Sequence, residues 1–193
     1  MSRSSLPALA VAMSAVLLTG CISLKSGPPL PLAPEVDLNR MYGGWYIIAG
    51  IPKRGFEDGM VKPYTVYSRR SDGDIREDFY VRRGSFGAPE KHYVVRDSVK
   101  PGTHNAFWRA IWPLNLPFPI VYVDPGYRYV LYGEQGRDLA WIYAREPVVA
   151  DEDYVRLLGR FKALGFDSSS FKKFVQRPED LGKPGYRSDG IKP

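Results

Sequence analysis

The chain has 193 residues, a formal net charge of +6, 13% aromatic residues and a single cysteine. One cysteine excludes an internal disulfide, and the scattered Lys and Arg residues form no basic helix or RNA-binding motif, so nothing predicts nucleic-acid binding. The basic balance instead suits proximity to anionic lipid headgroups, and the aromatic content is typical of β-structure that lines a cavity or packs a thin core.

The pattern of residues 1–20 is typical of an export signal. Arg3 is the only charged residue among them, and Leu6–Leu18 is an uncharged apolar run. This run is too short to cross a bilayer of roughly 30 Å as a helix, but it matches the apolar region of a signal peptide. We therefore set residues 1–20 apart from the folded domain.

The signal ends in Leu18-Thr19-Gly20-Cys21, which resembles the bacterial lipobox. Its small residues admit the peptidase, and its thiol accepts the diacylglyceryl chain, so Cys21 is the expected lipidation site and membrane anchor. Ile22 in place of Asp implies, by resemblance to enterobacterial lipoproteins, sorting to the outer membrane, on its periplasmic face. The alternative is an ordinary secretory signal followed by a stray cysteine.

Three further segments follow. The range 21–35 joins Cys21 to a stretch with four prolines and is expected to be an extended tether that lifts the domain off the membrane. The range 36–177 has the size of one domain with its own core. The range 178–193, rich in Gly, Pro and charge, is expected to be a disordered tail.

The first part of the domain alternates short β-rich runs with turn residues. The runs predict eight strands, at Gly44–Ile51, Met60–Ser68, Asp74–Arg82, Lys91–Lys100, Asn105–Trp112, Ile120–Asp124, Tyr127–Gly133 and Leu139–Arg145. Eight sequential strands joined by short turns can close into an up-and-down antiparallel barrel, which leaves no exposed edge. The predicted fold class is therefore all-β.

The hydrophobic period then changes from two residues to that of a helix. Asp151, Glu152 and Asp153 supply an N-cap and an acidic first turn, and Val155, Leu158, Phe161 and Leu164 recur at helical spacing. Gly165 can end this helix in a left-handed conformation, Ser168–Ser170 is expected to be a turn, and Lys173–Gln176 is expected to be a short final strand.

Three segments of this barrel resemble the signatures of the lipocalin family. The motif residues, in chain order, are Gly43, Trp45, Asp124, Tyr127 and Arg145. They match Gly-x-Trp, then Asp-x-x-Tyr (with Val in place of the usual preceding Thr), then the arginine that lies across the tryptophan ring. The resemblance extends over roughly Val36 to Gln176 and is closest to the bacterial outer-membrane lipoprotein subgroup, which is similar to apolipoprotein D. These motif residues are expected to determine the fold at the closed end rather than to touch ligand.

The resemblance implies a membrane-anchored protein that binds, stores or transports a fatty acid or lysophospholipid, with no cofactor, no metal and no enzymatic chemistry. The alternative is a structural or assembly lipoprotein that uses the same scaffold for protein contacts. The sequence does not decide whether the protein forms a homodimer. Haem or metal binding through His92 or His104 is a minor possibility, because no ligand spacing accompanies either residue.

Alternation along the strands and alignment to the family place one set of side chains inside the barrel. In the strand 105–112 the alignment favours the Ala and Trp side chains over the opposite face. The expected ligand-binding interior is Ile47, Ala49, Thr65, Tyr67, Ile75, Glu77, Phe79, Ala106, Trp108, Ala110, Trp141 and Tyr143. The alternative is that the aromatic side chains fill the barrel and leave no cavity.

Glu77 stands out because an inward carboxylate in an apolar barrel must be paired, hydrogen-bonded or neutral. We expect it to meet an inward Arg or a tyrosine such as Tyr67, or a ligand headgroup; a register slip of one residue would instead put it outside. The apolar, proline-rich segment Pro113–Pro119 is expected to be a loop, either exposed or folded over the barrel.

Overall fold

A computed structural model describes residues 28–53, 55, 57–99, 105–111 and 114–192. The predicted signal peptide, the lipobox and Cys21 lie outside the described residues. None of the described helices is long and apolar enough to span a membrane.

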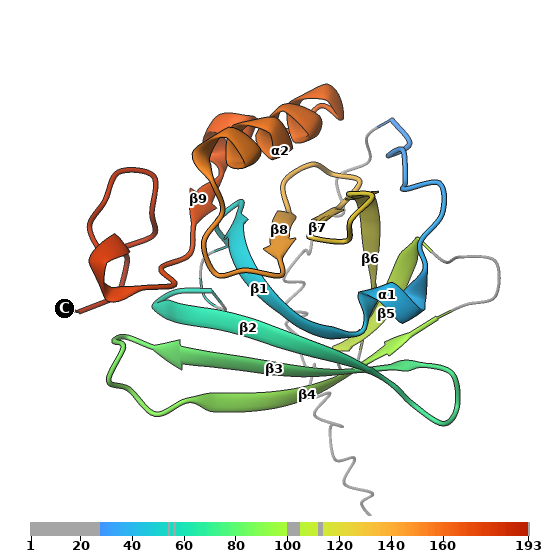
Figure 1. The fold of residues 1–193 in the computed structure, drawn as a ribbon, viewed down its shortest axis with the longest axis horizontal. Coiled ribbons are helices and arrows are strands. Elements are labelled where there is room, and N and C mark those ends of the chain that lie inside the picture. Colours follow the sequence, from blue (N-terminus) through green and yellow to red (C-terminus); the bar gives the residue numbers. More distant parts are fainter. Residues whose placement is uncertain (1–27, 54, 56, 100–104, 112–113, 193) are drawn as a thin grey trace, which may run out of the picture.

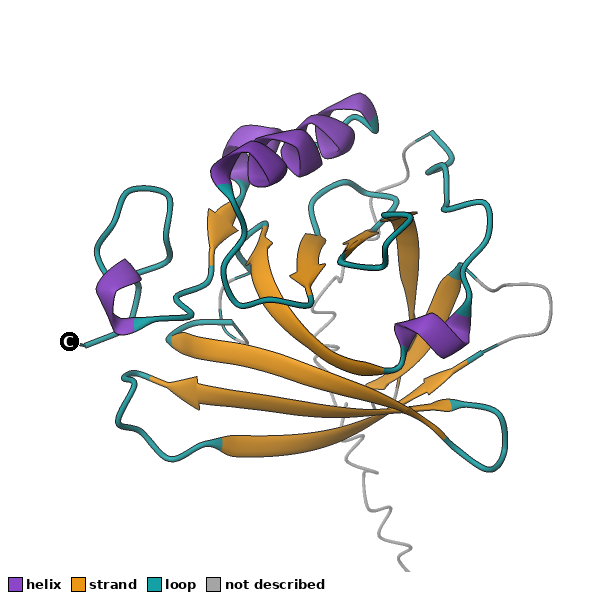
Figure 2. Ribbon diagram, viewed as in Figure 1, coloured by secondary structure: helices purple, strands orange, loops and turns teal. Residues whose placement is uncertain are grey.

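The fold is a closed antiparallel barrel of eight strands, drawn in Figure 1 and seen as one curved sheet in Figure 2. Consecutive strands pair from β2 to β8, β8 pairs with β1, and β1 pairs with β2, which closes the ring. The strands are β1 Gly43–Gly50, β2 Met60–Arg69, β3 Ile75–Arg83, β4 Lys91–Ser98, β5 Ala106–Ile111, β6 Leu114–Val123, β7 Tyr129–Gly133 and β8 Ala140–Ala144. The predicted fold class and the order of its strands are confirmed.

The remaining elements lie around this barrel. A short helix, α1 (Leu38–Met41), precedes β1, and the helix α2 (Asp151–Ala163) follows β8. A 3-10 turn, η1 (Ser168–Ser170), leads to the two-residue strand β9 (Lys172–Lys173), which pairs with β1 outside the ring. A second 3-10 turn, η2 (Pro178–Asp180), lies in the C-terminal segment.

The helix α2 packs on the outer face of the barrel (Figure 1). Leu157 and Phe161 are fully buried there against side chains of β1, β7 and β8. Val155, one of the apolar residues that recur at helical spacing, does not lie on this packed face and is 67% exposed. The predicted N-cap was also displaced, because Ala150 holds that position without a side-chain bond. The expected end at Gly165 is confirmed, with φ at +87°.

The prediction that Pro113–Pro119 is a loop was wrong for the described residues, because β6 begins at Leu114. Pro117 and Pro119 pair in register with Trp108 and Ala106 of β5. The amide of Ile120 donates to the carbonyl of Asn105, on the β5 side. The backbone N and C=O groups of alternate residues point to opposite edges of a strand, so those of Pro117 and Pro119 point away from β5. On that side β7 pairs with β6 only from Ile120 onward, so no strand partner requires an N–H at either proline.

Both ends of the domain are packed on the barrel, contrary to what the sequence suggested. Residues 178–192, expected to be disordered, are held at the loops that follow β1 and β3: the amide of Gly59 donates to the carbonyl of Asp189, and the amide of Lys192 to that of Gly84. The second half of the expected tether is also packed, since Ala33 is buried and its amide donates to the carbonyl of Ile120.

Candidate ligand-binding barrel

One end of the barrel is closed by a plug built on Trp45. This side chain is fully buried, and its indole N–H donates to the carbonyl of Met41 at 2.7 Å. The Arg145 guanidinium lies 3.7 Å from the Trp45 ring centre and donates to the carbonyls of Gly44, Arg40 and Tyr42. The expected stacking of the arginine on the tryptophan ring is therefore present.

The turn between β6 and β7 is fixed by Asp124. Its Oδ1 accepts from the amides of Arg128 and Tyr129, at 2.5 and 2.6 Å, as expected for a carboxylate that organises a turn. The hydroxyl of Tyr127 accepts from the amide of Asp37 at 2.7 Å, which ties the segment before α1 to this turn. The motif residues thus bind one another and the backbone at the closed end.

Most of the expected interior residues face the barrel axis. Ile47, Tyr67, Ile75, Phe79 and Tyr143 belong to one buried cluster, and Trp141 packs against it. Thr65 and Glu77 are also buried, which excludes the register slip considered for Glu77. Ala49 was placed wrongly: after a register shift between Ile47 and Ala49, it belongs to the cluster beneath α2.

The predicted face of β5 was wrong. Phe107 is fully buried in the interior cluster, and Arg109 makes an ion pair with Glu77, so these two side chains point inward. Ala106, Trp108 and Ala110 therefore take the other face, and Ala110 is exposed. Both faces of β5 carry large apolar groups, so alternation alone could not decide between them.

A charged cluster lies inside the barrel, where Arg109 is held between two carboxylates. Its Nε and Nη2 donate to the two oxygens of Asp97, at 3.0 and 3.2 Å, and its Nη2 also pairs with Oε2 of Glu77. The other oxygen of Glu77 accepts from the Thr65 hydroxyl at 2.8 Å. Asp97 is fully buried and Glu77 nearly so. The expected arginine partner of Glu77 is therefore Arg109.

A proton on Glu77 would balance the charges of this cluster without a second cation. Burial, together with the nearby Asp97, raises the pKa of Glu77 to about 7, although Arg109 opposes this shift. With Glu77 neutral, one carboxylate and one guanidinium remain, and the cluster carries no net charge. Burying an unbalanced charge is costly, so the neutral form is favoured.

A group of aromatic side chains packs beside this cluster. The ring centres of Phe118 and Tyr132 lie 4.2 Å apart, those of Tyr132 and Tyr143 4.8 Å, and those of Tyr67 and Phe107 5.9 Å. Arg109 lies over Phe118 at 4.0 Å. These rings occupy the lumen at this level, as the alternative of a barrel filled by aromatic side chains would require for this part of the interior.

Toward the other end, solvent reaches lumen-facing side chains. Tyr93 of β4 lies directly opposite the inward Phe79 and is 39% exposed. Trp141 is partly exposed, and its indole N–H donates to Glu57 in the loop after β1 at 2.7 Å. In the described part of the chain, β4 pairs with β5 only at its last two positions, Asp97 and Ser98. Beyond these two positions the described parts of β4 and β5 are not paired with each other toward this open end.

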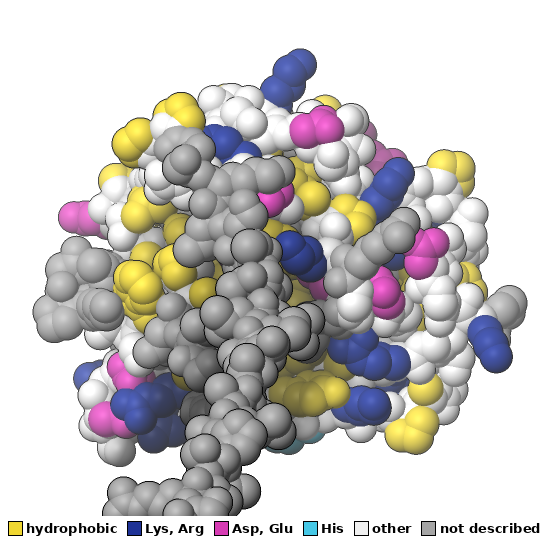
Figure 3. Space-filling model, turned by 180° about the vertical axis from the view of Figure 1, so that it is seen from behind, with side chains coloured by type: hydrophobic (Ala, Val, Ile, Leu, Met, Phe, Trp, Pro, Cys, Tyr) yellow, Lys and Arg dark blue, Asp and Glu magenta, His cyan; other side chains and the backbone are white. Residues whose placement is uncertain are grey.

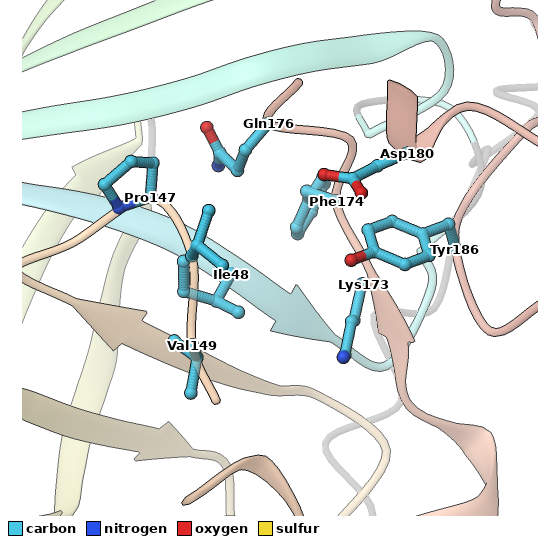
Figure 4. Close-up of a pocket in the computed structure, with 9 residues that line it drawn as sticks. Ile48, Pro147, Val149, Lys173, Phe174, Gln176, Asp180 and Tyr186 are labelled. Carbon is cyan, nitrogen blue, oxygen red and sulfur yellow. The ribbon is translucent and has the colours of Figure 1, made fainter. Parts of the chain in front are cut away.

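A separate small pocket lies outside the barrel, between β1, β9 and the C-terminal segment (Figure 4). Its volume of about 20 Å³ has room for roughly one water molecule. Gln176 donates from Nε2 to the carbonyls of Ile47 and Pro63, while its Oε1 has no partner. This pocket is too small for an acyl chain.

The described residues hold no group of three or more His, Cys, Asp or Glu side chains placed to bind a metal. His92 lies on the outer face of β4, where it bonds to Asp78 at 2.7 Å and stacks on Tyr80. His104 lies outside the described residues.

Comparisons with known proteins agree with this geometry. A family model described as a lipocalin-like domain matches residues 36–176. Outer membrane lipoprotein Blc of Escherichia coli is 30% identical over 177 residues, covering 90% of this chain and 97% of Blc. Temperature-induced lipocalin-1 of Arabidopsis thaliana is 25% identical over 150 residues, covering 73% of this chain and 80% of that protein.

Solved structures show the same fold at lower identity. Insecticyanin from the tobacco hornworm Manduca sexta superimposes with a TM-score of 0.61 at 15% identity, over 80% of this chain and 89% of its own. Apocrustacyanin C1 does so with a TM-score of 0.59 at 18% identity, over 75% and 83%. The chain belongs to the lipocalin family. Within that family it falls in the bacterial subgroup of Blc, the lipid-anchored lipoproteins of the outer membrane.

The residues that sequence reasoning missed are mainly partners from distant strands. Asp97 and Arg109 complete the charged cluster from β4 and β5, and Phe118 enters from the stretch taken for a loop. A partial signal existed in the sequence: Glu77 shares the period-two face of Ile75, Phe79 and Val81, so a buried partner was expected nearby. However, β4 and β5 carry several charged residues and do not single out Asp97 and Arg109. Only the pairing of the strands shows that they meet.

Proposed function

We propose that this lipocalin binds a single-chain amphiphile, a fatty acid or lysophospholipid, in the open-end half of its barrel, and that Cys21 carries the lipid anchor. The acyl chain lies above the aromatic group formed by Tyr67, Phe107, Phe118, Tyr132 and Tyr143. No covalent step takes part, and the ligand is held by loss of water from apolar surface.

The partial exposure of lumen-facing side chains at the open end is the observation that carries the proposal. A barrel filled throughout would bury Tyr93 and Trp141, as it buries Tyr67 and Trp45. Apolar contact at this end can hold an acyl chain because each buried methylene contributes about 0.8 kcal/mol. The stretch where the described parts of β4 and β5 are unpaired would be the route for a chain too long to be enclosed.

The charged cluster limits how deep such a ligand goes. Arg109 already has two carboxylate partners, and its side chain is only 17% exposed. A fatty acid carboxylate placed there would be a third carboxyl group around one cation and would give the buried cluster a net negative charge. The amphiphile therefore lies with its polar end toward solvent and its methyl end toward the aromatic group.

Tryptophan fluorescence tests the proposal. We expect saturable changes when the mature domain starting at Ile22 is titrated with a cis-unsaturated fatty acid or a lysophospholipid. Trp141→Phe should remove most of the signal, because Trp141 packs against the lumen cluster. Trp108→Phe is the matched control and should keep it, because Trp108 lies on the outward face of β5.

The same titration distinguishes lipid binding from the second candidate function, a scaffold for protein contacts. A folded domain that responds to neither class of lipid would favour a scaffold lipoprotein that acts through its outer surface. Equal loss of signal in both tryptophan variants would place the ligand outside the lumen and would contradict the proposal.

A further inference from the structure

The first described residues lie at the open end of the barrel. The carbonyl of Pro28 accepts from Nη1 of Arg137, in the turn between β7 and β8, at 2.9 Å. Arg137 also donates from Nε to the carbonyl of Leu164, just after α2. This turn belongs to the open end, because the amide of Ile51, after β1, donates to the carbonyl of Ala140 beside it.

From Pro28 the chain runs along the barrel to the closed end. Leu30 packs against the cluster beneath α2, and Ala33 is hydrogen-bonded to Ile120 of β6. Asp37 then reaches Tyr127 at the closed-end turn. Residues 28–37 therefore cross from one end of the barrel to the other as a packed segment, so they are not a free spacer.

The length of chain before this segment restricts where the anchor can lie. Cys21 is seven residues before Pro28, and seven extended residues reach about 25 Å at most. A compact domain of this size has a radius of gyration of about 15 Å and so measures roughly 40 Å across. An anchor on Cys21 can therefore lie below the open end but cannot pass beyond the closed end.

We propose that the open end of the barrel, led by the turn between β7 and β8, faces the lipid bilayer that holds the anchor. This inference rests on the proposed function in one respect, the lipidation of Cys21. It adds the orientation of the binding site: the lumen opens toward the membrane surface, so an amphiphile can pass between bilayer and barrel over a short distance.

The surface chemistry of this end is compatible with lipid headgroups. Exposed lysines lie in each of three segments there: Lys53 after β1, Lys91 at the start of β4 and Lys192 in the C-terminal segment. Carboxylates Asp58 and Glu90 lie at the same end. Figure 3 likewise shows basic and acidic side chains intermixed on the face seen from behind. The charges at the open end are therefore compatible with contact to lipid headgroups. The orientation itself is inferred from the position of Pro28.

The experiment uses the full lipidated protein, in which the anchor consumes the only native thiol. Single cysteines are introduced at Gln135 (open end, turn between β7 and β8), Gly87 (open end, opposite rim) and Ser71 (closed end), labelled with bimane. Gln135, Gly87 and Ser71 are exposed, and a Cβ at Gly87 meets no atom within 4 Å. Each protein is reconstituted into phosphatidylethanolamine–phosphatidylglycerol vesicles that contain a headgroup nitroxide lipid.

We expect strong quenching at Gln135→Cys, weaker quenching at Gly87→Cys and none at Ser71→Cys. Insertion of about ten Gly and Ser residues before Pro28 should abolish this order, because a long flexible linker no longer restrains the domain. Stronger quenching at Ser71→Cys, or equal quenching at all three sites with the native tether, would overturn the orientation alone. Failure of the protein to float with the vesicles would overturn the anchor, and the orientation with it.

Discussion

Arg109 lies between Asp97 and Glu77 inside the barrel, and the three side chains need one proton to be neutral. Glu77 could be recognised from the sequence as an inward carboxylate because it shares the period-two face of Ile75, Phe79 and Val81. Its partner could not be assigned, since β5 offers large apolar groups on both faces. The pairing of β4 with β5 places Asp97 opposite Arg109 and so shows which face of β5 points into the barrel.

The proton on Glu77 predicts a pH dependence of stability. In the unfolded chain Glu77 ionises near its ordinary pKa of 4.5, whereas in the folded protein its pKa is about 7. The folded state therefore binds more protons across this interval, and the free energy of unfolding falls as pH rises from about 5 to about 8. Glu134, with its pKa raised by burial to about 7, acts in the same direction.

Urea unfolding at the two ends of this range checks the prediction. Glu77→Gln should flatten the dependence in part, and the double variant with Glu134→Gln should flatten it further. A wild-type protein whose stability rises between these pH values, or a Glu77→Gln variant with the wild-type slope, would show that Glu77 is ionised in the folded state.

Removal of the cation should be more damaging than removal of Glu77. Arg109→Met leaves the buried Asp97 carboxylate and the Glu77 carboxyl group without their cation and should cost about 3–5 kcal/mol at neutral pH. Arg128→Met is the matched control: its side chain is 64% exposed beside Asp124, and its loss should cost less than about 1 kcal/mol. Denaturant midpoints at pH 7 compare the two. Equal losses would mean that the interior cluster contributes no more than a surface ion pair.

At the scale of elements, strand order and the positions of most strands followed from period-two runs and their turn residues. The exceptions have physical reasons. Prolines argued against a strand at 114–119, yet β6 tolerates Pro117 and Pro119 where its second edge is unpaired. The register shift in β1 turned Ala49 outward, and such a shift leaves no mark in the hydrophobic pattern.

The helix α2 offers a test of its packed face. Phe161→Ala should cost about 3–5 kcal/mol, because this fully buried ring packs against Phe166 and Phe171 at 5.1 and 4.7 Å. Val155→Ala, on the exposed face, should change stability by less than about 0.5 kcal/mol. Thermal or urea unfolding measures both. A larger loss of stability in Val155→Ala than in Phe161→Ala would mean that Val155, not Phe161, lies on the packed face of α2.

At the scale of the whole molecule, the closed end and the open end have different roles. The family motifs Trp45, Asp124 and Arg145 bind one another or the backbone at the closed end, which is why they predict the fold and say little about ligand. The partly exposed lumen-facing side chains, the unpaired stretch between β4 and β5, and the first described residue of the chain all lie toward the open end. Composition and motif order predicted the barrel and the anchor. The path of residues 28–37 depends on tertiary contacts that no local pattern encodes.

Native mass spectrometry of the folded mature domain with a lysophospholipid tests whether the barrel holds a ligand. We expect a one-to-one complex that Tyr93→Arg weakens, because the substitution places a charge on the lumen-facing side of the open end. Val155→Arg, on the outer face of α2, should leave the complex unchanged. A folded domain that forms no lipid complex, or one whose complex is insensitive to Tyr93→Arg but lost in Val155→Arg, would contradict a ligand site inside the barrel.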